Sequence, residues 1–133
     1  MTQTRKYRFT LAEDDPTYLF LLHTHIGGSF PGCSIASFST AEEALRHILH
    51  AGTDMLITDH GMGEMTGTEL VLELRKRRFQ TPIIVISGDS AVEKEARLAG
   101  ANVFLEKKPH CKELEAHMRR LLSTVEIESG QKG

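Results

Sequence analysis

Three acidic residues in a row, Glu13, Asp14 and Asp15, follow an apolar stretch near the start of the chain. Adjacent carboxylates repel one another, so they need a cation, a helix terminus or water around them. Asp15 precedes Pro16, and because proline is favoured in the first turn of a helix, we predict that Asp15 caps a helix. Glu13 and Asp14 are then left at the end of the apolar stretch for another role.

Other polar groups follow later apolar runs in the same way: Asp59, Ser87, and the pair Lys107 and Lys108. If these runs are parallel strands of one sheet, the polar groups meet at the edge where such sheets bind their ligands. Glu13, Asp14 and Asp59 would form an oxygen-rich pocket suited to Mg²⁺, which binds carboxylates and phosphate oxygens. The alternative is that the three acids simply face solvent.

Strand-like and helix-like segments alternate along the chain. We expect strands at 7–12, 34–38, 55–58, 82–87 and 102–106. We expect helices at 16–26, 41–51, 67–78, 91–99 and 111–125. The alternation predicts an α/β fold, a doubly wound (βα)₅ parallel five-stranded sheet with helices on both faces.

The expected helices carry signals at their ends. The pair Gly27-Gly28 predicts the end of the first helix. Thr40, Thr66 and Ser90 each stand three residues before a glutamate. This spacing predicts a capping box at the start of three helices.

Composition limits the classes of protein that fit. The 133 residues are 40% hydrophobic and 26% charged, with a formal net charge of -2. These values fit one soluble domain and give no reason to expect nucleic-acid binding. No apolar run is long enough for a membrane span, and no signal peptide is visible, so we expect a cytoplasmic protein. We predict a domain at 1–125 and a disordered tail or truncation edge at 126–133.

Four stretches carry a family resemblance: "FTLAEDDP", "LITDHGMGEMTG", "PIIVISG" and "GANVFLEKKP". In this order and with these gaps, the sequence resembles the response-regulator receiver domain over about residues 7–123. The resemblance implies a CheY-like or flavodoxin-like sheet in the strand order 2-1-3-4-5. It also implies a phosphoprotein of two-component signalling that receives a phosphoryl group from a histidine kinase or histidine phosphotransfer protein.

The resemblance gives the acidic residues their roles. Asp59 matches the phosphoacceptor, and Glu13 and Asp14 match the acids that hold Mg²⁺ beside it. Gly61 stands two residues after the acceptor, where the family lends a backbone carbonyl to the metal. Because glycine leaves open space beside the acceptor, we expect easy access of water and a short-lived phosphoryl group. His60 directly follows Asp59 and could modulate the site, but we favour a solvent-facing side chain.

The resemblance also implies a switch. Ser87 matches the hydroxyl that is drawn to the phosphoryl group, and Phe104 matches the aromatic residue that rotates into the vacated space. The family lysine stands three residues after the aromatic residue and directly before proline. In this sequence, Lys107 stands three residues after Phe104, whereas Lys108 stands directly before the proline. We favour Lys107, because strand geometry fixes the face to which a side chain points.

Partners and competing functions follow from the same resemblance. We expect a downstream protein to bind segments 91–123 of a monomer or weak homodimer, with no nucleic acid and no membrane involved. A pseudo-receiver that binds partners without phosphate remains an alternative, since Gly63 replaces the family's usual proline. An aspartyl-phosphate hydrolase of the haloacid dehalogenase type would need a D-x-D motif that "AEDDPT" does not match. We therefore expect a phosphoacceptor signalling domain that catalyses only its own phosphorylation and dephosphorylation.

Overall fold

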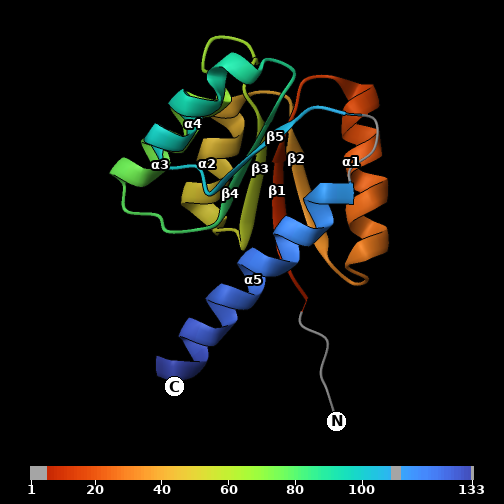
Figure 1. Cartoon of the computed structure of the whole chain (residues 1–133), viewed down its shortest axis with the longest axis vertical. Coiled ribbons are helices and arrows are strands. Elements are labelled where there is room, and N and C mark those ends of the chain that lie inside the picture. The colour runs from red at the N-terminus through yellow and green to blue at the C-terminus, as the bar shows by residue number, and fades with distance from the viewer. Residues whose placement is uncertain (1–5, 109–111, 133) are drawn as a thin grey trace.

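The computed structural model describes residues 6–108 and 112–132, with side chains described as far as residue 125. Its strands are β1 (Arg8–Ala12), β2 (Ser34–Phe38), β3 (Met55–Asp59), β4 (Ile83–Ser87) and β5 (Val103–Glu106). Its helices are α1 (Pro16–Ser29), α2 (Ala41–Ala51), α3 (Gly67–Lys76), the short 3₁₀ helix η1 (Ser90–Val92), α4 (Glu93–Ala99) and α5 (Lys112–Lys132). Strands and helices therefore alternate as predicted (Figure 1).

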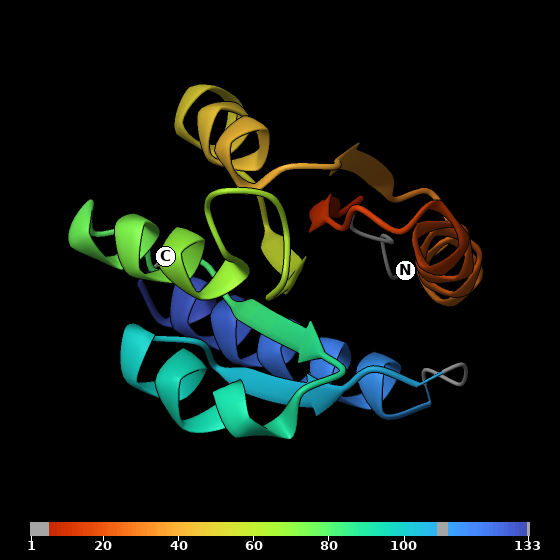
Figure 2. The ribbon, with the colours of Figure 1, turned by 90° about the horizontal axis from the view of Figure 1, so that it is seen from above.

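The five strands form one parallel sheet in the order β2-β1-β3-β4-β5. Helices α1 and α5 cover one face, and α2, α3 and α4 cover the other (Figure 2). The predicted doubly wound fold and its strand order are confirmed. Because β1 pairs directly with β3, the carboxyl ends of these two strands lie side by side.

The sheet has a separate hydrophobic core on each face. Every residue of β3 and of β4 is buried, as their unbroken apolar runs predict for strands covered on both sides. The edge strand β2 is only partly buried. The central strands are thus a rigid base for the groups at their carboxyl ends.

Three of the residues predicted as caps do cap helices, among them Thr40, whose hydroxyl accepts a hydrogen bond of 3.2 Å from the N–H of Glu43 at the start of α2. The other two caps lie at the starts of α1 and α3. The Asp15 side chain accepts a hydrogen bond of 3.0 Å from the backbone N–H of Thr17 at the start of α1. At the start of α3, Thr66 and Glu69 form a complete capping box. Both helices start directly beside the carboxyl edge of the sheet, so their caps fix the chain next to the acidic residues.

The prediction that Gly27-Gly28 ends the first helix was wrong. Helix α1 continues through both glycines to Ser29. The helical hydrogen bonding extends to Phe30, whose N–H donates to the carbonyl of Ile26 at 2.9 Å. The Phe30 side chain is buried in the core between α1 and the sheet, so tertiary packing outweighs the low helix propensity of glycine.

The predicted capping box at Ser90 was also wrong. Asp89 caps the chain instead, accepting a hydrogen bond of 3.0 Å from the N–H of Ala91. This cap starts η1, and α4 begins only at Glu93 without a side-chain cap. An aspartate one residue earlier thus takes the role expected of the serine.

Helix α5 extends to Lys132 and so includes most of the segment assigned from the sequence to a tail. The predicted boundary at residue 125 stays a prediction. Among residues 6–108 and 112–132, none of the helices combines the length and the apolar character needed to cross a membrane.

Candidate functional site

Glu13, Asp14 and Asp59 come together at the carboxyl edge of the sheet. One side-chain oxygen from each lies within 4.8 Å of the other two. Glu13 is 2% exposed and Asp59 is 9% exposed, whereas Asp14 faces solvent. The cluster therefore contains two buried carboxylates and one solvent-exposed carboxylate. This set of oxygens fits a hard divalent cation such as Mg²⁺, which retains some of its water.

Glu13 is held in place from two directions. Its Oε2 accepts a hydrogen bond of 3.0 Å from the backbone N–H of Asp15 and another of 3.0 Å from Nζ of Lys107. Burial raises the pKa of Glu13 above its ordinary value of 4.5, and these two hydrogen bonds only partly offset that rise. The nearby charge of Asp59 raises the pKa further. An added cation would relieve this repulsion.

The two adjacent lysines point to different places. Lys107 Nζ lies 3.0 Å from Glu13 Oε2 and 3.4 Å from Asp59 Oδ2. Lys108 Nζ lies 3.9 Å from Glu113 of α5, and more than half of its side chain is exposed. The structure thus brings Lys107, and not Lys108, to the acidic cluster.

The charge of Lys107 is kept by its partners. Burial alone would lower the pKa of this ammonium, but the hydrogen bond to Glu13 and the charge of Asp59 outweigh burial and raise it. The backbone of Lys107 is fixed as well, since its N–H donates to the carbonyl of Ser87 at 2.9 Å. A positive charge is therefore held next to Asp59.

Hydrogen bonds from backbone N–H groups hold the loop after Asp59 in place. The N–H of His60 donates to Oδ1 of Asp59 at 2.8 Å, and the N–H of Gly67 donates to the carbonyl of His60 at 2.8 Å. A side chain at position 67 would collide with the carbonyl oxygen of Asp59. Only glycine fits there, so α3 can start directly against Asp59.

Two other glycines shape the same loop. A Cβ at Gly61 would meet nothing within 4 Å, so the space at this position near Asp59 is open as predicted. Gly63 has a φ of 42°. Proline, which usually stands there in the family, has φ fixed near −65° and could not adopt this conformation. The loop therefore follows a path that depends on glycine.

The interpretation of His60 as a simple solvent-facing residue was wrong. The ring is half-buried, and its Nδ1 lies 2.7 Å from Oγ1 of Thr68, which is buried in the first turn of α3. His60 thus ties the loop after Asp59 to α3. From the sequence, only the position of His60 after Asp59 is visible, since its partner Thr68 lies eight residues away.

Ser87 and Phe104 lie near the carboxyl edge but are engaged with protein groups. Ser87 is buried at the end of β4, and its hydroxyl accepts a hydrogen bond of 3.1 Å from the N–H of Asp89. The Phe104 ring is already buried in the core that faces α2, α3 and α4. The ring lies inward in this structure, and its predicted rotation stays a prediction.

Tyr18 is a residue of this site that the sequence analysis missed. Its ring centroid lies 4.7 Å from Nζ of Lys107, and the residue is buried in the first turn of α1. The sequence places Tyr18 near the sheet edge, because Pro16 starts the helix. It gives no sign that the ring meets a lysine from the far end of the chain.

Comparison with known proteins agrees with this geometry. The chain is 29% identical over 117 residues to the two-component response regulator PhoP of Pseudomonas aeruginosa, covering 86% of this chain and 51% of that protein. It is 29% identical over 129 residues to the sensor protein EvgS of Escherichia coli, covering 96% of this chain and 11% of that protein. The chain therefore spans about half or less of the length of these relatives.

Solved structures share the fold. The response regulator TrrA of Thermotoga maritima, in complex with Mg²⁺-BeF, is 25% identical with a TM-score of 0.80, covering 86% of this chain and 98% of that chain. The receiver domain of a LuxO repressor from Vibrio parahaemolyticus is 20% identical with a TM-score of 0.86, covering 97% of this chain and 99% of that chain. The second likeness shows the fold alone.

A family model described as the response regulator receiver domain matches residues 9–119, and the chain belongs to this family. It is a signalling phosphoacceptor module of a two-component system. The cluster of Glu13, Asp14 and Asp59 is consistent with the phosphorylation site of such a module and typical of its magnesium site.

Proposed function

We propose that Asp59 accepts a phosphoryl group from a histidine kinase or a histidine phosphotransfer protein in a Mg²⁺-dependent reaction. The observation that supports this most strongly is the position of Asp59. Its carboxylate lies beside two further carboxylates and 3.4 Å from the ammonium of Lys107. Such a group can act as a nucleophile once the charge of the incoming phosphoryl group is neutralised.

In the proposed reaction, an Asp59 oxygen attacks phosphorus and the phosphorus–nitrogen bond to the donor histidine breaks. The electron pair of that bond leaves with the imidazole, and a mixed anhydride forms on Asp59. The Glu13, Asp14 and Asp59 carboxylates would hold Mg²⁺, with the backbone carbonyl of Gly61 as a further ligand. When bound, the metal supplies positive charge for the phosphoryl oxygens.

Two other side chains would receive the phosphoryl oxygens. Lys107 already lies at Asp59 and supplies a point charge. Ser87 lies at the end of the neighbouring strand, and its hydroxyl can donate its proton to a phosphoryl oxygen while it accepts from the N–H of Asp89. The transferred group then pulls on the loop after β4, which leads directly into η1 and α4.

The downstream partner is proposed to bind the surface formed by segments 91–123. Leu98 on α4 supports this choice, since it is 78% exposed and lies among charged residues on a shallow surface. We propose that the isolated domain is a monomer or a weak homodimer, with catalytic activity limited to its own phosphorylation and dephosphorylation.

Incubation with a small phosphodonor and Mg²⁺ tests the proposal. Intact-mass measurement should show a single phosphoryl adduct that is lost in hydroxylamine, because hydroxylamine cleaves acyl phosphates. Beryllofluoride should bind only when Mg²⁺ is present. A protein that takes neither group would support the phosphate-independent pseudo-receiver instead.

Mg²⁺ should raise the unfolding temperature, and this effect should shrink as the pH falls. A ligand at about 100 times its Kd adds about 2.7 kcal/mol of stability, which corresponds to roughly 10 °C for a domain of this size. Protons compete with the metal for Glu13. Because the pKa of Glu13 is raised, the carboxyl takes up its proton at a higher pH than an ordinary glutamate. Loss of the metal effect should therefore begin above pH 4.5.

Differential scanning fluorimetry with and without Mg²⁺ across this pH range measures the effect. Asp14→Asn should lose most of the shift, because it removes the exposed metal ligand. Asp15→Asn is the matched control, since asparagine also caps helices and Asp15 is bound to Thr17 rather than placed in the cluster. Equal shifts in both variants, or a shift that does not depend on pH, would contradict the proposed metal site.

A bulky residue at position 61 should lengthen the life of the phosphoryl group several-fold. The space beside Gly61 is open, so a larger side chain there can be accommodated and can exclude the attacking water. Phosphoryl half-lives of Gly61→Ala, Gly61→Met and Gly61→Arg should increase with side-chain size. Gly27→Met on α1 is the control, because that position is also open but remote. Unchanged half-lives in the position-61 series would refute this prediction.

A further inference from the structure

We propose that Tyr18 is a positioning residue whose ring selects Lys107, rather than its neighbour Lys108, for the phosphoacceptor site. The effect of this selection on phosphoryl transfer rests on the proposed function. Which of the two lysine side chains lies at Glu13 and Asp59 can be measured without phosphorylation.

The ammonium of Lys107 lies between two kinds of attractive group. On one side are the carboxylates of Glu13 and Asp59, at 3.0 Å and 3.4 Å from Nζ. On the other side is the Tyr18 ring, whose centroid lies 4.7 Å from the same nitrogen. Cations within about 6 Å of an aromatic ring centroid are attracted by the negative ring face. The ring thus completes a binding site for one ammonium group.

Tyr18 can act in this way because its own position is fixed. Pro16 and the Asp15 cap define the first turn of α1, and Tyr18 belongs to that turn. The residue is buried and packs in the core shared by α1, α5 and the sheet. A ring held this firmly loses little conformational freedom when it binds a cation.

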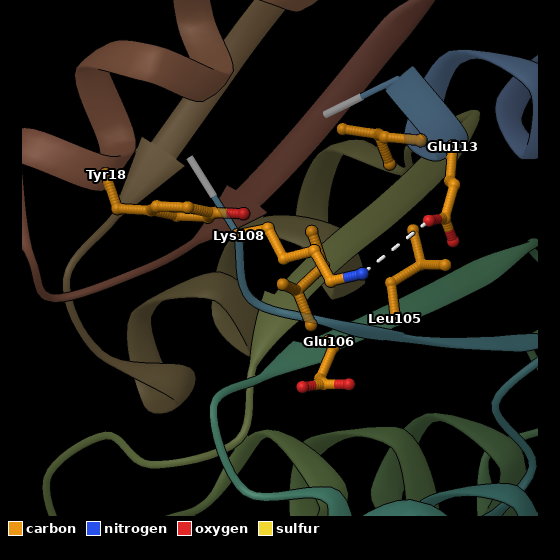
Figure 3. Close-up of a pocket in the computed structure, with 7 residues that line it drawn as sticks. Tyr18, Leu105, Glu106, Lys108 and Glu113 are labelled. Carbon is orange, nitrogen blue, oxygen red and sulfur yellow. Dashed lines mark ion pairs between the residues drawn. The ribbon is translucent and has the colours of Figure 1, made fainter. Parts of the chain in front are cut away.

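The neighbouring lysine is directed elsewhere. Tyr18 and Lys108 line the same small pocket between α1, β5 and α5, together with Leu105, Glu106 and Glu113. Figure 3 shows the Lys108 ammonium directed toward Glu113, with Tyr18 on the opposite side of the pocket. Lys108 therefore has an exposed acid as its partner, and Lys107 has the buried acids and the ring.

The ring adds to a backbone register that already favours Lys107, since the Lys107 N–H is bonded to the carbonyl of Ser87. Successive side chains of an extended chain point to opposite sides, so a shift of one residue would exchange the two ammonium groups. Both lysines carry the same charge, and the acids alone would attract either. The Tyr18 ring lies against the ammonium of Lys107 in this structure, and so it favours the observed register.

The test compares Tyr18→Phe, which keeps the ring, with Tyr18→Leu, which keeps an apolar side chain but removes the ring. Phosphorylation by a small phosphodonor at saturating Mg²⁺ should be near the wild-type rate in Tyr18→Phe. It should fall roughly 3- to 30-fold in Tyr18→Leu, the range expected for loss of a partly buried cation–π contact. In the Tyr18→Leu background, a second change of Lys108→Met should lower the rate again. The same change should have no effect in the wild type.

Nuclear magnetic resonance gives a readout that is independent of phosphorylation. The ε-methylene protons of Lys107 should show nuclear Overhauser contacts with the Glu13 side chain in the wild type and in Tyr18→Phe, and these contacts should weaken in Tyr18→Leu. A folded Tyr18→Leu protein with a wild-type rate, and Lys107 signals that still show close contact with Glu13 and Asp59, would overturn the proposal. If the wild type takes no phosphoryl group, the proposed function fails, but the Lys107 signals still decide the role of Tyr18.

If Tyr18→Leu does not fold, variants with fluorinated phenylalanines at position 18 replace it in the test. They keep the shape of the ring while weakening its negative face. The phosphorylation rate and the population of inward Lys107 should fall with each added fluorine. Rates that do not change along the series would show that the ring has only a packing role.

Discussion

An Asp59→Asn variant should carry no phosphoryl group after incubation with a small phosphodonor and Mg²⁺. Asparagine matches aspartate in shape, so the loop contacts to His60 and Gly67 can persist while the nucleophilic carboxylate is lost. Glu13 is the other buried carboxylate beside Lys107 among the described residues, and the proposal assigns it to the metal rather than to the phosphoryl group. The loss should therefore be complete rather than partial.

Intact-mass measurement after rapid quenching checks this result. Asp15→Asn should keep a full adduct, because Asp15 is taken up by the N–H of Thr17. Circular dichroism and thermal unfolding establish that Asp59→Asn is folded. An adduct of normal size on Asp59→Asn would place the phosphoryl group elsewhere and contradict the proposed function.

Lys107→Met should lower the rate of phosphorylation by about 100-fold or more, whereas Lys108→Met should change it by less than about 2-fold. A preorganised positive group at a developing charge is typically worth about 10²- to 10³-fold in rate. Lys107 meets this condition because its ammonium lies 3.4 Å from Asp59. Lys108 is directed to Glu113, and its exposed ion pair contributes little.

The adjacent lysines form a matched pair for this experiment. Both changes remove one positive charge from neighbouring positions, so a general effect of net charge would lower both rates equally. Stopped-flow measurement at saturating Mg²⁺ separates the phosphorylation step from metal binding. Equal losses in the two variants, or a larger loss in Lys108→Met, would show that Lys107 does not have the proposed role.

The sequence predicted the fold well because the signals for it are local. Continuous apolar runs identified β3 and β4, and the Asp15 and Thr66 caps placed the helix starts beside the site. The acids could be assigned to one edge because parallel strands end together. Lys107 followed from the alternation of side chains along β5.

The errors concern features that depend on contacts distant in sequence. Gly27-Gly28 has the composition of a helix end, but the buried Phe30 extends the helix. The sequence does not reveal the contact between His60 and Thr68, because this contact forms only when the loop folds onto α3. Tyr18 meets Lys107 only when α1 and β5 come together across the sheet. Local patterns carry no information on such contacts.

A crystal structure of the protein grown with Mg²⁺ and beryllofluoride tests the central claim most directly. The account predicts beryllium joined to a carboxylate oxygen of Asp59, with the metal contacting Asp59, Glu13 and Asp14. It also predicts the Lys107 ammonium on a fluorine atom and Lys108 directed outward. Beryllofluoride bound away from Asp59, or a metal that avoids the three acids, would contradict the account.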